Sequence, residues 1–99
     1  MDQATIIDIA RKYKLLIENY IHPKQVVLFG SYSNGTQRPD SDIDLAVLVD
    51  KIDGTWLRKS AHLYQLTRQV DVRIEPILLD RNNDPSGFVK HILAEGISI

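Results

Sequence analysis

The pattern of apolar positions divides the chain into alternating helical and extended segments. Apolar residues recur at steps of three and four from Ile6 to Tyr20, which predicts an amphipathic helix over about residues 3–20. His22-Pro23 ends this helix, because the residue before a proline avoids helical backbone angles. The run over 26–29 is short, continuous and apolar, which indicates a buried strand.

The middle of the chain continues with a loop, a strand and a helix. Glycine, asparagine and proline punctuate residues 30–41, and Ser31 is suited to begin a short helix within this loop. Residues 43–49 form a second apolar run with alternating side chains, which predicts another strand. A second long helix is expected over about residues 55–68, with an apolar face made of Leu57, Ala61, Tyr64 and Leu66.

The last third of the chain contains a further strand and helix. Apolar and charged residues alternate over 70–79, which predicts a third strand. Pro76 has no amide donor, which indicates either a position at the edge of the sheet or the end of strand pairing. Asp84, followed by a proline, is typical of a helix start, and Gly96 of a helix end. Residues 97–99 could add a short strand.

This order of elements favours an α/β (α+β) fold, with helices flanking a small mixed sheet of three or four strands. The length of 99 residues predicts one domain spanning 1–99. The chain has no cysteine, which excludes disulfides, thiolate zinc sites and a cysteine nucleophile. No apolar run approaches the roughly 20 residues of a membrane span, and the N-terminus lacks the layout of a signal peptide. We therefore expect a cytoplasmic protein without a membrane partner.

Charge is distributed unevenly along the chain. The formal net charge of −1 argues against broad electrostatic binding of nucleic acid, which we do not expect as a partner. Residues 40–53 nevertheless contain five aspartates against one lysine, whereas residues 54–69 are basic. Acidic side chains are thus concentrated in a segment that also contains an apolar strand, and this combination requires an explanation.

The informative stretch is Gly30-Ser31, ten further residues, then Asp42 and Asp44. Two residues apart on a strand, both carboxylates point to the same face. They repel one another unless a cation lies between them, and Mg²⁺ prefers such oxygen ligands together with substrate phosphates. A glycine and a serine at a helix start can hold phosphate through backbone amides and a hydroxyl. One loop therefore offers both a metal site and a phosphate site.

Three other motifs do not fit. A P-loop requires Lys-Ser/Thr where this chain has Thr36 and Gln37. An EF-hand loop requires glycine and glutamate where Leu45 and Lys51 stand. The three histidines are scattered without the spacing of a zinc site.

The Gly-Ser-x10-Asp-x-Asp arrangement resembles the signature of the nucleotidyltransferase superfamily, which has the fold of DNA polymerase β. The fuller run over 30–45 is similar to the minimal nucleotidyltransferase (MNT) family. The resemblance also covers the apolar strand before Gly30, the third strand and the closing residues 94–97. It therefore spans most of the chain and implies the nucleotidyltransferase fold.

The resemblance implies a nucleotide site in the loop after the first strand. Ser31 and the backbone of Gly30 would hold the triphosphate of ATP or another NTP, and Arg38 would add a phosphate contact. Many family members have an arginine where this chain has Asn34. This departure bears on nucleotide affinity.

The resemblance also implies a metal site for two Mg²⁺ ions, with Asp42 and Asp44 as ligands. The family has a third carboxylate on the following strand. Glu75 is preferred for this position, because counting back from Gly96 places it where the family has its acid. Asp71 is the alternative third carboxylate.

The implied activity is Mg²⁺-dependent transfer of a nucleoside monophosphate, with AMP from ATP as the expected case, to a hydroxyl acceptor. Similar proteins act as antitoxins of HEPN-domain toxins, and some adenylylate a tyrosine of the toxin. A HEPN-domain partner and a homo- or hetero-oligomer are therefore expected. The alternative is a non-catalytic antitoxin that neutralises a HEPN partner by binding alone.

Overall fold

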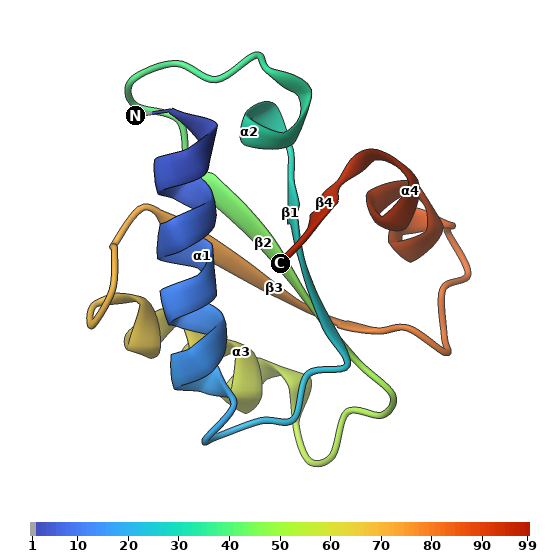
Figure 1. Ribbon diagram of the computed structural model, residues 1–99. Coiled ribbons are helices and arrows are strands. Elements are labelled where there is room, and N and C mark those ends of the chain that lie inside the picture. The colour runs from blue at the N-terminus through green and yellow to red at the C-terminus, as the bar shows by residue number, and fades with distance from the viewer. Residues whose placement is uncertain (1) are drawn as a thin grey trace.

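The computed structural model describes residues 2–99, which form four helices and four strands (Figure 1). In chain order these elements are α1 (Gln3–Ile17), β1 (Gln25–Phe29), α2 (Ser31–Asn34), β2 (Ile43–Val49), α3 (Trp56–Thr67), β3 (Ile74–Asp80), α4 (Phe88–Glu95) and β4 (Ile97–Ser98). The predicted order of elements is confirmed, including the short helix at Ser31 and the short last strand.

The four strands make one mixed sheet in the order β3-β2-β1-β4. β1 runs antiparallel to both β2 and β4, whereas β2 and β3 are parallel and connected through α3. β3 lies at an edge, which is one of the two alternatives that the lack of an amide donor at Pro76 indicates. β2 is a central strand, and its buried side chains pack into the apolar clusters on both faces of the sheet.

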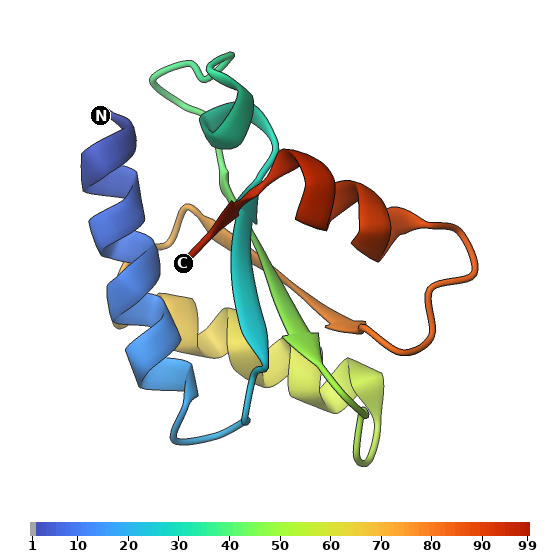
Figure 2. The same cartoon turned by 45° about the vertical axis from the view of Figure 1, so that its right-hand side comes forward.

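Helices cover both faces of this sheet. Figure 2 shows α1 and α4 on opposite sides of it. α1 and α3 contribute to the larger apolar cluster, which includes Leu45 and Val47 of β2. α4 packs Val89 and Ile92 against Ala46 on the other face. No helix within residues 2–99 has both the length and the apolar character that a membrane span requires.

The first helix begins and ends at identifiable hydrogen bonds. The Asp2 side chain accepts the Thr5 amide at 2.9 Å and caps the N-terminus. The helix ends at Ile17, earlier than predicted, because the Tyr20 amide bonds to the Ile17 carbonyl in a tighter turn. The Tyr20 side chain is consequently half-exposed instead of continuing the buried face.

Two predicted segment starts are wrong for local reasons. β3 begins at Ile74 and not at residue 70, because Asp71 accepts the amide of Arg73 and forms a turn. α4 begins at Phe88, several residues after the predicted cap Asp84. The Asp84 carboxylate still accepts the amides of Val89 and Lys90, so it caps the helix from a preceding turn.

The predicted apolar face of α3 is also wrong in part. Its buried residues are Leu63, Leu66 and Thr67. Leu57 is 73% exposed and Tyr64 is 47% exposed. The helix is therefore rotated relative to the predicted face, and it presents these two apolar side chains at the surface.

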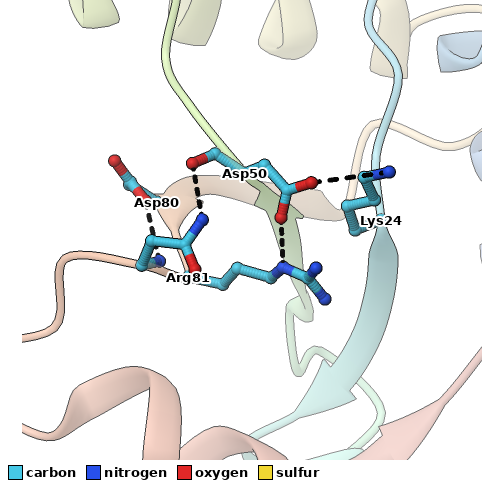
Figure 3. A network of polar contacts seen from close by, with 5 residues as sticks. Lys24, Asp50, Asp80 and Arg81 are labelled. Carbon is cyan, nitrogen blue, oxygen red and sulfur yellow. Dashed lines mark hydrogen bonds and ion pairs between the residues drawn. The ribbon is translucent and has the colours of Figure 1, made fainter.

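A network of ion pairs and hydrogen bonds joins three strands at the end of the sheet where β2 and β3 finish (Figure 3). Asp50 pairs with Lys24, at 3.4 Å, and with Arg81. The Asn82 side chain donates to the Asp50 carbonyl, and the Asp80 carboxylate accepts the Asn82 amide. The hydrogen bond from Arg81 is the main cause that holds the pKa of Asp50 below its ordinary value.

The buried hydroxyl of Tyr13 provides a test of how α1 is fastened to α3. It donates to the Leu63 carbonyl at 2.7 Å, and the side chain is fully buried. We expect Tyr13→Phe to lower the free energy of unfolding by about 1 kcal/mol, because the buried hydrogen bond to the Leu63 carbonyl is lost. Urea denaturation measures the change, and Tyr20→Phe is the matched control at a half-exposed tyrosine. Equal effects of the two substitutions would contradict this role.

Candidate active site

The loop between β1 and β2 begins with a glycine that no other residue replaces easily. Gly30 has a φ of 75°, which favours glycine, and it precedes the first residue of α2, Ser31. A Cβ atom at Gly30 would collide with the Asp44 carboxylate. The backbone of the loop therefore lies directly against this aspartate, and the predicted phosphate and metal sites are adjacent.

Contacts on both sides hold α2 in place. The Ser33 hydroxyl donates to the Gly30 carbonyl at 2.9 Å. The side-chain amide of Gln3, at the start of α1, donates to the Tyr32 carbonyl at 2.9 Å. Tyr32 itself is buried in the main core. These contacts fix the orientation of Ser31 relative to the sheet.

Strand register places three side chains in a row across the sheet. Phe29 of β1 is the antiparallel partner of Asp44, and Glu75 of β3 is its parallel partner. Side chains of directly paired residues lie on the same face. Phe29, Asp44 and Glu75 therefore lie side by side, on the face that α4 partly covers. Of the two predicted third carboxylates, the structure brings Glu75 to Asp44.

The electrostatics of Asp44 reflect this crowding. Partial burial, the negative charges of Glu75 and Asp42, and a hydrogen bond with Glu75 together raise the pKa of Asp44 to about 6. Burial is the largest of these causes, and all of them disfavour the ionised form. A cation bound among the carboxylates would reverse the effect.

The carboxylates also act on a tyrosine from α3. Partial burial raises the pKa of Tyr64, and the charges of Glu75, Asp42 and Asp44 raise it further. The phenol therefore lies within electrostatic range of the candidate site. Tyr64 also lines a broad surface groove along α3, where Arg58, Lys59 and Arg68 contribute positive charge.

The remaining predicted residues lie outside this row. Asp71 pairs with the guanidinium of Arg73 at 2.8 Å in the turn before β3, and this hydrogen bonding lowers its pKa. Arg38 is exposed, and its amide donates to the Ser41 hydroxyl. Asn34, at the family's arginine position, is exposed and accepts hydrogen bonds from Thr36.

The donor chemistry at the candidate site fits magnesium. Asp44 and Glu75 provide adjacent carboxylate oxygens, and Asp42 adds a third within electrostatic range. Within residues 2–99, no three histidine, aspartate or glutamate side chains are gathered tightly enough to enclose a metal ion. Asp42 is exposed, and exposed side chains change rotamer readily. The adjacent pair and the exposed third carboxylate are therefore compatible with a site that an ion would draw together.

Sequence reasoning missed two aromatic residues beside the carboxylates. The sequence pattern places Phe29 in a buried strand, and it favours a core or partner-contact position for Tyr64 on its helix. The sequence shows that Phe29 directly precedes Gly30 and so lies near the predicted phosphate loop. It does not show the antiparallel register that pairs Phe29 with Asp44.

The raised pKa of Asp44 predicts a pH-dependent gain in stability when its charge is removed. Where a carboxyl has a higher pKa in the folded than in the unfolded state, the folded protein becomes less stable as pH rises from the unfolded-state pKa to the folded-state pKa. We expect Asp44→Asn to stabilise the metal-free protein at pH 8 by about 1–2 kcal/mol, allowing for partial exposure to solvent, and to have little effect at pH 4.

Thermal unfolding in EDTA at the two pH values measures this difference. Asp40→Asn is the matched control, because it neutralises an exposed carboxyl in the preceding loop. A loss of stability at pH 8 in Asp44→Asn would show that the charge is not a destabilising feature of the metal-free site.

The chain is similar in sequence to known nucleotidyltransferases. Residues 6–99 match the family model described as Polymerase beta, Nucleotidyltransferase. A putative protein adenylyltransferase of Methanocaldococcus jannaschii, MJ1379, is 41% identical over 46 residues, and the match spans 46% of each chain. A second from the same organism, MJ0141, is 29% identical over 95% of this chain and 98% of its own length. The protein adenylyltransferase MntA of Shewanella oneidensis is 54% identical over 40% of this chain and 30% of its own.

Solved structures extend the similarity to the whole fold. The crystal structure of a toxin-antitoxin with AMP-PNP superimposes with a TM-score of 0.61 and 27% identity, over 99% of this chain and 72% of that chain. A mutant of the toxin-antitoxin MntA-HpeT superimposes with a TM-score of 0.60 and 27% identity, over 100% and 72%. The α/β architecture with its mixed four-stranded sheet is thus the nucleotidyltransferase fold. The chain belongs to the Polymerase beta, Nucleotidyltransferase family.

Proposed function

We propose that this protein is a Mg²⁺-dependent protein adenylyltransferase that transfers AMP from ATP to a hydroxyl of a HEPN-domain toxin and thereby acts as its antitoxin. The observation that carries the proposal is the contact between the Gly30 backbone and Asp44, with Glu75 on the next strand. It puts a nucleotide loop and a carboxylate pair within one small site.

The relatives support the choice of donor and acceptor. Two of the similar proteins are named putative protein adenylyltransferases, and MntA is named a protein adenylyltransferase. A structural relative is a toxin-antitoxin with AMP-PNP, an analogue of ATP. These names favour ATP over other nucleotides, a protein acceptor over a small molecule, and a toxin as the partner.

The phosphate end of the substrate would bind at the start of α2. The Ser31 hydroxyl and the backbone at Gly30 are the donors, and the exposed Arg38 would supply positive charge from the same loop. Glycine at position 30 lets the phosphates approach the backbone, since any side chain would occupy the space next to Asp44. Asn34 provides no charge here, so Arg38 is the cation in this loop available to a phosphate.

Asp42, Asp44 and Glu75 would hold the metal ions. Two Mg²⁺ ions bound there would neutralise the phosphate charge and orient the attacking and leaving oxygens. The partial burial of Asp44 strengthens its interaction with any cation, because the local dielectric is lower than that of water. The exposed Asp42 would turn toward the same ion.

Glu75 would act on the acceptor side of the site. It lies on β3, on the opposite side of Asp44 from β1 and the phosphate loop. An acceptor hydroxyl that approaches from this edge would meet the Glu75 carboxylate, which can accept its proton. The hydroxyl oxygen would bond to the α-phosphorus of ATP while the bond from that phosphorus to the β-phosphate oxygen breaks, and pyrophosphate would leave. Asp71 is held by Arg73 in the preceding turn and is less suited to this role.

A second function is favoured by the surface of α3. The exposed apolar residues Tyr64 and Val72 line the basic groove, and Leu57 is exposed on the same helix. Exposed apolar surface with a polar rim is typical of protein interaction sites. The chain could therefore neutralise a HEPN-domain partner by binding alone, without transfer of a nucleotide.

The decisive test is incubation with labelled ATP, Mg²⁺ and a HEPN-domain toxin from the same organism. We expect label on the partner, and loss of at least 100-fold in the rate with Asp42→Asn/Asp44→Asn, because metal-assisted catalysis requires these ligands. Mass spectrometry of the partner identifies the modified hydroxyl.

The same double variant separates the two functions. Its failure to protect cells from the toxin, combined with loss of labelling, supports catalysis. Full protection by a variant that cannot label would support neutralisation by binding. Labelling that is undiminished in the variant would contradict the proposed site.

The third carboxylate can be identified by comparing two single variants. We expect Glu75→Gln to reduce the labelling rate by at least 100-fold, whereas Asp71→Asn should retain activity within about threefold. Both replace a carboxylate by an amide of similar shape. The reverse order of effects would assign the role to Asp71.

A further inference from the structure

Two aromatic rings from distant parts of the chain meet beside the candidate site. Phe29 is the last residue of β1, and Phe88 is the first residue of α4. Their ring centroids are 6.0 Å apart and their planes are at 89°, an edge-to-face contact. Phe88 is 38% exposed, and Phe29 is partly exposed. The pair therefore presents aromatic surface to solvent.

The exposure of Phe88 is not needed to attach α4 to the sheet. Val89 and Ile92 are buried against the sheet in the second apolar cluster. Phe88 instead extends over Phe29, which is paired with Asp44 and directly precedes Gly30. An exposed aromatic pair next to a phosphate loop and a carboxylate indicates a place for a ligand with a flat ring.

We propose that the Phe29–Phe88 pair is the nucleobase subsite of this protein, with the Phe88 ring contacting the base of the bound NTP. This inference rests on the proposed function, because it assumes a nucleotide whose phosphates lie at Gly30 and Ser31. Aromatic side chains that contact bases contribute to binding of nucleic acids with little dependence on sequence, because every base has a π-face.

The order of the strands assigns this subsite to the nucleotide and not to the acceptor. Phe29 and the phosphate loop are both continuous with β1, on one side of Asp44. Glu75, which would meet the acceptor hydroxyl, lies on β3 on the other side. The base of a nucleotide bound in the loop therefore has the aromatic pair as its neighbour, and the acceptor has the open edge.

This subsite has a consequence for selectivity. Contact with a ring face selects weakly among bases, because every base has a π-face. The subsite should therefore add affinity for ATP and for other nucleotides alike, and a preference for ATP would require hydrogen bonds made elsewhere in the site.

The test compares ATP with inorganic tripolyphosphate, which has the phosphates but no base, in the presence of Mg²⁺. We expect Phe88→Ala to weaken ATP binding by about tenfold and to leave tripolyphosphate binding unchanged. Phe88→Trp should retain or improve ATP affinity. Leu93→Ala is the matched control, since it removes an exposed apolar side chain from the same helix. Calorimetry measures the affinities, and upfield shifts of the adenine protons report the ring contact.

The outcomes distinguish this inference from the proposed function. Equal affinity of the unmodified protein for ATP and tripolyphosphate, or unchanged ATP affinity in Phe88→Ala, would overturn the subsite and leave the proposed function intact. An equal loss for both ligands would show a general structural effect and also overturn it. Absence of binding to either ligand by the unmodified protein would overturn both proposals.

Discussion

The pairing of β2 with a strand on each side is the constraint on which the site depends. β2 is nearly all buried, and its register places Asp44 between Phe29 and Glu75. A shift of one residue in this register would turn Asp44 toward the core formed with α1 and α3. The apolar residues of β2 therefore stabilise the fold and also fix the position of the carboxylate.

Gly30 couples this sheet to the loop that follows β1. Its positive φ turns the chain into α2, and its lack of a side chain leaves room for the Asp44 carboxylate. Gln3 then connects α2 to α1, so the loop is held from the opposite face of the sheet. The loop after β1, the carboxylates and the core are thus parts of one packing arrangement, and a change at any of them would disturb the others.

Local patterns predicted most elements, because apolar periodicity, glycine and proline act over a few residues. The spacing of Gly30, Ser31, Asp42 and Asp44 predicts a phosphate loop beside two carboxylates, whereas Glu75 and Arg38 follow from the family resemblance. The roles of all of them are predictions. Features that depend on contacts between residues far apart in the sequence could not be predicted from these local patterns. The sequence pattern could not show that Asp71 would bond to Arg73 and delay β3, or how α3 would be rotated on the core. Nor could it show that Phe88 would meet Phe29 across the chain.

The two ends of β2 place aspartate side chains in opposite electrostatic environments. Asp50, directly after β2, has Lys24 and Arg81 as partners, and its pKa is lowered. At the other end, the charges acting on Asp44 are those of Glu75 and Asp42, and its pKa is raised. The protein therefore stabilises the ionised form of Asp50 at one end of β2 and destabilises the ionised form of Asp44, through burial and neighbouring negative charge, at the other. A carboxylate whose ionised form the surrounding protein destabilises is stabilised most by a bound cation. A metal-dependent transfer site requires this property.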